Sequence, residues 1–280
     1  MELKDNKCNC NKKEELYKKY PPFKNQLYRD LRINYENFFI HRLTQINNRE
    51  EDYIKQVKRV SFELSNMCNY SFIHKKCPTS KYKNKKILSS EIVYKTIDEL
   101  KKINYSGVIA FHRYNEPLID PRLFQFIEYV NKNIPLAKIF ILSNGFYINQ
   151  YIADKFFEYK IWILAASAYF PEEYQRLINL EVKIPYFVFW SELDERKSIY
   201  ESEEFNLNLE CNAPILDVNI CSDGRLGLCC MDWKGEYSFS DLSDKTLAEV
   251  LRSENVLKIH NALINKKRVL PICRRCSIKR

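Results

Sequence analysis

The sequence contains no long hydrophobic segment. Among its 280 residues, the longest apolar stretches, such as 139–142 and 161–166, run only four to six residues. A membrane-spanning helix needs about 20 apolar residues, so we expect no such helix. Residues 1–7 also lack the apolar core of a signal peptide. These absences predict a cytoplasmic protein.

The composition is that of a globular protein with an excess of cysteine. Apolar residues make up 45% of the chain and charged residues 29%, which excludes the disordered class of protein. Ten cysteines are present. Disulfides are rare in reducing cytosol, so clustered cysteines there indicate a metal site or catalysis.

The charge is unbalanced towards lysine and arginine. The net charge is +9, and residues 266–280 carry seven basic and no acidic side chains. A basic surface suits an anionic partner, such as an acidic peptide, a phosphorylated metabolite or nucleic acid. The same charge is also compatible with an ordinary solvated surface.

The hydrophobic pattern divides the chain into three segments, 1–55, 56–205 and 206–280. The first is polar and lysine-rich, with a helix predicted near 24–46 and the remainder poorly ordered. The second alternates predicted strands and helices. The strands are 57–64, 107–112, 138–142, 161–166 and 182–189, and the helices are 91–102, 121–133, 150–159 and 172–178. This α/β alternation predicts a parallel sheet covered by helices, closed fully or partly into a barrel, with ligands at the carboxyl ends of the strands.

The third segment has a different pattern. Residues 217–220 and 225–228 flank Ser222-Asp-Gly224, a turn signal that predicts a β-hairpin. Thr246 and Glu249 form a capping box that opens a helix. We expect that helix to extend towards Asn265, with a break near 253–255.

Four cysteines of this segment have the spacing of metal ligands. The spacing is C-x12-G-x4-C from Cys211 through Gly224 to Cys229. A C-x2-C pair, Cys273 and Cys276, follows after a long gap. The two-residue gap of the last pair lets both sulfurs face one metal, and four thiolates suit either zinc or an iron–sulfur cluster. Spacing alone leaves both metals open. It assigns no role to Cys221 or Cys230.

The run 211–276 resembles the carboxyl-terminal SPASM or twitch extension of radical S-adenosylmethionine (SAM) enzymes. Its pattern is similar to the shorter twitch form, which implies one auxiliary [4Fe-4S] cluster held by the four cysteines. The longer SPASM form has further cysteines after the last pair. We do not expect them, because the chain ends four residues beyond Cys276.

The resemblance to radical SAM enzymes extends over 57–276 and implies a partial (β/α)6 TIM-like barrel. Short motifs after successive strands are similar to those that bind SAM in the family. They are Tyr114-Asn115-Glu116-Pro117, Ser143-Asn144-Gly145 and Ser167. By this resemblance, we expect Tyr114, Asn115, Glu116, Ser143, Asn144 and Ser167 to bind SAM. His112 and Arg113 are expected near the mouth of the same pocket.

The loop after the first strand departs from the family pattern. Radical SAM enzymes carry C-x3-C-x2-C there, whereas this chain has Cys68 and Cys77, with Phe72 and Lys75 at the other two ligand positions. The loop is better described as C-x5-H-x2-C, which makes Cys68, His74 and Cys77 the expected ligands of the SAM-binding [4Fe-4S] cluster. Histidine replaces cysteine in Rieske centres. Alternatively, Cys8 or Cys10 supplies the third thiolate, or the site is degenerate.

The activity implied by the resemblance is reductive cleavage of SAM to a 5′-deoxyadenosyl radical that abstracts hydrogen from a substrate. A reductant such as flavodoxin or ferredoxin is implied as partner. We expect a ribosomal peptide as substrate, narrowly ahead of a small molecule such as a sugar or alcohol. Nucleic acid and membranes are not expected as partners. A different class of function, a non-catalytic zinc-bearing binding module, stays open.

Overall fold

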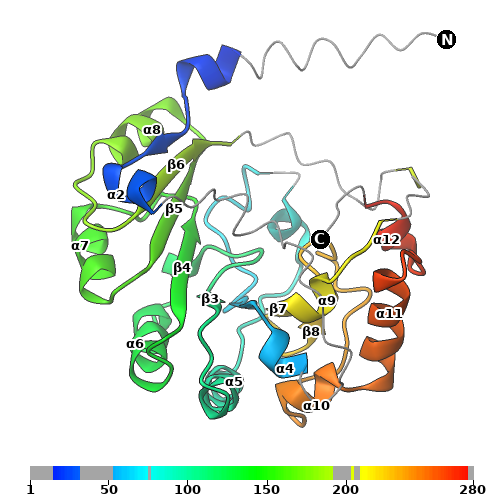
Figure 1. The fold of residues 1–280 in the computed structure, drawn as a ribbon. Coiled ribbons are helices and arrows are strands. Elements are labelled where there is room, and N and C mark those ends of the chain that lie inside the picture. The colour runs from blue at the N-terminus through cyan, green and yellow to red at the C-terminus, as the bar shows by residue number, and fades with distance from the viewer. Residues whose placement is uncertain (1–14, 32–52, 75–76, 192–202, 205–208, 277–280) are drawn as a thin grey trace, which may run out of the picture.

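The computed structural model describes residues 15–31, 53–74, 77–191, 203–204 and 209–276 (Figure 1). Its centre is an eight-stranded sheet of order β1-β6-β5-β4-β3-β2-β7-β8. The strands are β1 Phe23–Lys24, β2 Arg59–Phe62, β3 Val108–Ala110, β4 Lys138–Ser143, β5 Ile163–Ala168, β6 Tyr186–Trp190, β7 Asp217–Ile220 and β8 Leu226–Gly227. Neighbours from β6 to β7 pair in parallel, and β1 and β8 are antiparallel edge strands. The predicted α/β fold with a parallel sheet is confirmed.

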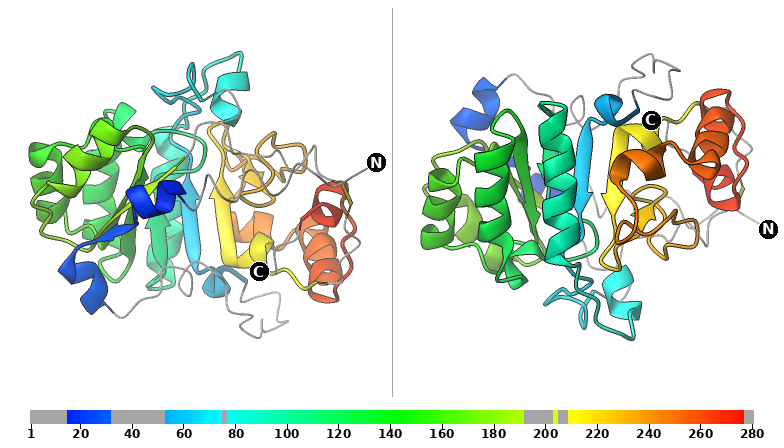
Figure 2. Two further views of the ribbon diagram at one scale, coloured as in Figure 1. Left: turned by 90° about the horizontal axis from the view of Figure 1, so that it is seen from above. Right: turned by 90° about the horizontal axis from the view of Figure 1, so that it is seen from below.

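Four helices cover one face of the sheet (Figure 2). They are α5 Ser90–Lys102, α6 Leu123–Asn133, α7 Gln150–Glu158 and α8 Pro171–Ile178, all predicted within two residues at each end. Their starts follow from local chemistry, since the side chain of Ser89 caps α5 and that of Asn149 caps α7. Each turns an apolar stripe to the main core, which also takes the helix-facing residues of the strands.

The opposite face of the sheet has a smaller core of its own. Val108, Ala110, Phe140, Ile163 and Ala165 pack there against Tyr28 of α2 (Gln26–Asp30). Side chains on one face of a strand recur every second residue. Ser167 therefore continues the row of Ile163 and Ala165 towards the carboxyl end of β5.

The amino-terminal segment corrects the sequence prediction. Of the helix predicted near 24–46, the described residues contain only α2, and residues 32–52 lie outside them. Lys24 belongs to β1 rather than to a helix. Asn25 is the reason that the helix starts after Lys24. Its amide donates to the carbonyls of Ile184 (2.7 Å) and Val182 (3.1 Å), and its Oδ1 accepts from the N–H groups of Tyr186 and Tyr28. These bonds fix the segment to β6 and override the helical spacing of its apolar residues.

The predicted carboxyl-terminal hairpin is confirmed. Gly224 adopts a φ of 85° in the turn between β7 and β8, a conformation that favours glycine. β7 pairs in parallel with β2, so the hairpin extends the main sheet. Arg59 of β2 also forms a buried ion pair with Asp217 of β7.

The last helices follow the predicted pattern. Thr246 and Glu249 make the expected capping box of α10 (Leu247–Leu251), and a break separates it from α11 (Glu254–Ile264). Glu99 of α5 accepts the N–H groups of Leu247 (3.0 Å) and Ala248 (3.2 Å), which attaches α10 to the helical layer. The remaining short helices are α4 Tyr53–Gln56, η2 Pro78–Lys81, η3 Pro117–Ile119, α9 Ala213–Leu216 and α12 Pro271–Arg274.

The helices of the described residues are all too short or too polar to span a bilayer, in line with the absence of long apolar runs.

Candidate functional site

Glu116 joins the loops that follow β3 and β4. Its side chain is fully buried, and three donors surround its carboxylate. Oε1 accepts from the hydroxyl of Ser143 (2.8 Å) and the N–H of Leu118 (3.1 Å), and Oε2 accepts from the N–H of Asn144 (2.7 Å). Burial raises the pKa of Glu116 to about 7, while these hydrogen bonds act in the opposite direction. All three partners of the carboxylate are hydrogen-bond donors, which favours its ionised form because that form only accepts hydrogen bonds.

Asn144 connects this pair of loops to the loop after β2. Its side-chain amide donates to Oδ1 of Asn69 at 2.7 Å and to Sγ of Cys68 at 3.5 Å. The N–H of Glu116 donates to the carbonyl of Met67 at 2.9 Å. The structure therefore brings together Cys68, Glu116, Ser143 and Asn144 at the carboxyl end of the parallel strands.

Tyr114, Asn115 and Ser167 lie at the same end of the sheet. The N–H of Tyr114 donates to Oε1 of Glu63 at 3.2 Å, and its hydroxyl donates to the carbonyl of Cys230. Asn115 folds back on its own loop, because its Oδ1 accepts the N–H of Arg113 at 2.9 Å.

Residues 68–74 lie over the ends of β4 and β5. Tyr70 packs edge-on against Tyr169 and Phe146, and the imidazole of His74 packs against Tyr169 with ring centroids 5.7 Å apart. His74 is 5% exposed. Cys68, whose Sγ also accepts the N–H of Tyr70 at 3.4 Å, is half-buried. Cys8 and Cys10 lie outside the described residues.

The four predicted cysteines of the carboxyl-terminal segment line a single hollow. Cys211, Cys229, Cys273 and Cys276 meet there among apolar side chains and Arg268. Burial raises the pKa of Cys273 to about 12, with the neighbouring thiol of Cys211 adding to the effect. Burial likewise raises the pKa of Cys229. Thiols in such surroundings are protonated unless a metal takes the place of the proton.

The donor chemistry of this hollow fits an iron–sulfur cluster. Four cysteine thiols lining one hollow are the donor set of a [4Fe-4S] cluster, in which each iron takes one thiolate. Four thiolates are also a donor set of zinc. Within the described residues, no three Cys, His, Asp or Glu side chains form a group that could hold a single metal ion.

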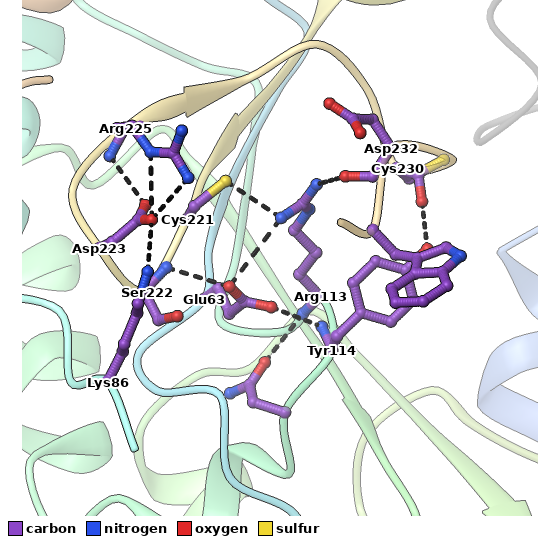
Figure 3. Close-up of polar contacts among 12 residues, drawn as sticks. Glu63, Lys86, Arg113, Tyr114, Cys221, Ser222, Asp223, Arg225, Cys230 and Asp232 are labelled. Atoms are coloured by element: carbon purple, nitrogen blue, oxygen red, sulfur yellow. Dashed lines mark hydrogen bonds and ion pairs between the residues drawn. The ribbon is translucent and has the colours of Figure 1, made fainter. Parts of the chain in front are cut away.

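A buried polar network joins the loop after β3 to the cysteine-bearing segment (Figure 3). Arg113, whose side chain is 3% exposed, lies at its centre. Its guanidinium donates to Sγ of Cys221 (3.0 Å) and to the carbonyls of Asp232 (2.7 Å) and Cys229 (3.4 Å), and lies 3.9 Å from the carboxylate of Glu63. Cys221 is therefore held by Arg113 and does not line the hollow.

Sequence reasoning placed Arg113 near the pocket mouth but missed this network. Glu63 accepts the N–H groups of both Tyr114 (3.2 Å) and Ser222 (3.0 Å), so it ties the ends of β2, β3 and β7 together. A side chain on Gly227 would come 3.2 Å from the guanidinium of Arg113, so glycine leaves room for it. The signal was weak: Glu63 directly follows β2, and Arg113 is the third residue after β3.

Comparisons with known proteins agree with this geometry. Residues 211–277 match the model of the SPASM family, described as an iron-sulfur cluster-binding domain. A curated relative is the S-adenosyl-L-methionine-dependent 2-deoxy-scyllo-inosamine dehydrogenase of Niallia circulans, 30% identical over 98 residues. That match spans 34% of this chain and only 38% of the dehydrogenase.

Solved structures of radical SAM enzymes share the fold. BtrN in complex with AdoMet and 2-DOIA superposes with a TM-score of 0.61 at 16% identity, over 79% of this chain and 93% of BtrN. The enzyme anSMEcpe with bound AdoMet and the Cp18Cys peptide gives a TM-score of 0.54 at 12% identity, over 78% of this chain and 85% of that one. The chain thus shares its fold with solved radical SAM enzymes, as predicted, and its residues 211–277, the SPASM segment, match the SPASM family model.

Proposed function

We propose that the protein is a radical SAM oxidoreductase with two [4Fe-4S] clusters. The observation that carries the proposal is a pair of separate cysteine-containing sites, one of which lies at the carboxyl ends of the parallel strands. The loops of Cys68, Glu116 and Asn144 are hydrogen-bonded into one unit, and four cysteines line a separate hollow. SAM on a reduced cluster supplies a 5′-deoxyadenosyl radical, and the protein orients the substrate and excludes water.

In this proposal, Cys68, His74 and Cys77 hold the SAM-binding cluster. His74 is favoured as the third ligand because it is buried in the same loop, over the ends of the strands. Tyr114, Asn115, Ser143, Asn144 and Ser167 line the SAM site, and Glu116 positions their loops. Cys211, Cys229, Cys273 and Cys276 would hold the auxiliary cluster, whose contribution would be to accept an electron from the substrate.

Two substrate classes fit this chemistry. A small molecule is favoured by the partial similarity to a dehydrogenase of 2-deoxy-scyllo-inosamine and by the BtrN complex with 2-DOIA. A peptide is favoured by the net charge of +9 and by the similar fold of anSMEcpe, solved with a bound peptide. We place the small molecule first, because that relative also shares sequence.

Iron content tests the two-cluster proposal. Anaerobically reconstituted protein should be brown and hold about eight irons, four for each cluster. Cys273→Ser should lower this to about four, whereas the matched Cys221→Ser should keep about eight, since Cys221 contacts Arg113 outside the hollow. A colourless protein with one zinc would support the binding-module alternative instead.

SAM cleavage tests the chemistry. With dithionite as reductant, the loaded protein should convert SAM to 5′-deoxyadenosine and methionine. If a protein with eight irons does not cleave SAM, the proposed activity is wrong.

The third ligand of the SAM-binding cluster needs a separate comparison. His74→Ala should lower the iron content by about four and abolish cleavage, while Cys8→Ala/Cys10→Ala should change neither. The reverse result would assign the ligand to the amino-terminal cysteines.

A further inference from the structure

A second cavity lies beside the buried network around Arg113. Residues 81–86, called the loop stem below, form part of its wall. The cavity holds about 250 Å³, and residues from three parts of the chain line it. Glu63 and Arg113 come from the ends of β2 and β3, Tyr82 comes from the loop stem, and Cys221 and Trp233 come from the SPASM segment. Whole-ligand sites usually measure about 300–1,000 Å³, so this cavity suits one end of a ligand.

The rim of the cavity is strongly cationic. Its charged lining consists of Lys81, Lys83, Lys86, Arg113, Arg225 and Lys234 against Glu63 and Asp223. Both carboxylates are already neutralised inside the protein. Glu63 faces Arg113, while Asp223 accepts from Lys86 at 2.9 Å and from Arg225 at 2.8 Å. Burial alone would raise the pKa of Asp223, but the hydrogen bonds from Arg225 and Lys86 lower it to about 2.

The lysines on one wall of the cavity, Lys81 and Lys83, therefore carry positive charge that no carboxylate of the lining neutralises. Lys81 lies over the ring of Trp233 at 5.3 Å, and no carboxylate among the described residues pairs with Lys81 or Lys83. The Nε–H of Arg113 is buried and has no acceptor within the described part of the chain. A concave surface lined by charge of one sign concentrates its field, so this cavity attracts anions.

The walls are fixed in place. The hydroxyl of Tyr82 donates to the carbonyl of Trp233 at 3.0 Å, and the amide of Asn66 holds the loop stem through the carbonyl of Asn84 at 2.8 Å. Burial raises the pKa of Tyr82, so its hydroxyl stays a neutral donor. The cavity is therefore formed before any ligand arrives, which lowers the cost of binding.

We propose that this cavity binds an anionic group, a carboxylate or a phosphate, of the substrate. That the anion belongs to the substrate rests on the proposed function. The anion-binding site itself is inferred only from the cavity and its charges. Arg113 in its lining touches the carbonyl of Cys229, a lining residue of the cysteine hollow, and precedes Tyr114 of the SAM loop. An anion held here would therefore lie one side chain, that of Arg113, away from a residue that lines the cysteine hollow.

Calorimetric titration of reconstituted protein with inorganic phosphate and with a hexaglutamate peptide tests the site. Lys81→Glu/Lys83→Glu should weaken binding of whichever probe binds by about tenfold or more, since two attractive charges become repulsive. Lys132→Glu/Lys258→Glu makes the same change in net charge on exposed helix positions outside the cavity and should change binding less than twofold. Lys81→Met/Lys83→Met removes the charge without reversal and should give an intermediate loss.

Each outcome decides the inference. Binding of phosphate alone points to a phosphorylated small molecule, and binding of hexaglutamate alone points to an acidic peptide, and both support the site. Binding of neither probe overturns it, as does an equal loss in the Lys132/Lys258 control. Iron content and SAM cleavage are measured on the same preparation. Full cleavage without anion binding therefore rejects only the cavity, whereas anion binding without cleavage rejects only the proposed activity.

Discussion

At the scale of residues, two buried charged side chains organise the site. Glu116 gathers donors from two loops, and Arg113 gathers acceptors from the SPASM segment. Each is buried where an unpaired charge would be costly, so each constrains the loops that supply its partners. Both act by positioning loops, and neither is expected to touch the reacting atoms.

Glu116→Gln should destabilise the protein. Glutamine presents an amide NH₂ where a carboxylate oxygen now accepts, so one of the donors from Ser143, Leu118 or Asn144 loses its partner. We expect the free energy of unfolding to fall by about 1–3 kcal/mol, measured by anaerobic denaturant titration. Glu128→Gln on the exposed side of α6 is the control and should change it by less than about 0.5 kcal/mol. An unchanged stability for Glu116→Gln would contradict the joining role.

Arg113→Lys should selectively empty the auxiliary site. A single ammonium cannot reach Cys221, Cys229 and Asp232 together as the planar guanidinium does. We expect the iron content to fall from about eight to about four per chain while SAM cleavage is retained. Arg29→Lys, exposed on α2, should keep all the iron. Full iron content in Arg113→Lys would show that the network does not support the cysteine loop.

At the scale of elements, α11 carries a buried histidine that makes the stability of the fold depend on pH. His260 is 0% exposed and packs edge-on against Tyr53 at 5.7 Å. Neither of its ring nitrogens has a hydrogen-bond partner among the described residues. Burial lowers the pKa of His260 to about 4, so the helix packs with a neutral imidazole.

The stability should therefore fall with pH on the acid side of neutrality. An unfolded histidine titrates near 6.5, so the folded state binds fewer protons between pH 6.5 and 4, and stability is lost as the pH falls through that window. Between pH 7.5 and 5.5, His260 should account for a loss of about 1 kcal/mol in the free energy of unfolding. His260→Leu should flatten this part of the profile. The same slope in the variant would assign it to other groups.

At the scale of the whole molecule, both ends of the described chain complete the central sheet. β1 seals the β6 edge, and β7 and β8 extend the sheet beyond β2. Figure 1 shows the amino-terminal elements on one side of the sheet and the SPASM helices on the other. The loops of Cys68, Glu116 and Asn144 and the cysteine hollow are consequently held by one continuous sheet.

Asn25→Ala should loosen the β6 edge. The substitution removes two donated and two accepted hydrogen bonds, and it leaves the carbonyls of Val182 and Ile184 without this donor. We expect a loss of roughly 2 kcal/mol in the free energy of unfolding. Asn255→Ala, exposed on α11, should not lower it. Equal stability of the two variants would mean that segment 15–31 contributes little to the frame.

The sequence by itself determined the local elements. The helix predicted at 91–102, the capping box of α10 and the turn at Gly224 all appear as predicted, because each depends on residues close in the chain. Neighbouring strand ends also brought Glu116, Ser143 and Asn144 together as the motifs implied. These features are local, or follow from the regular connection of parallel strands.

Only the tertiary structure decided the long-range pairings. Residues far apart in sequence meet in the pairing of β1 with β6, in the pairing of β7 with β2 and in the network around Arg113. Asn25 and Tyr186, for example, are 161 positions apart. No local pattern encodes such partners, since the hydrogen bonds of a strand can be satisfied by any neighbour of the right register. The cationic cavity belongs to this second class, because three distant segments form it only when the sheet is complete.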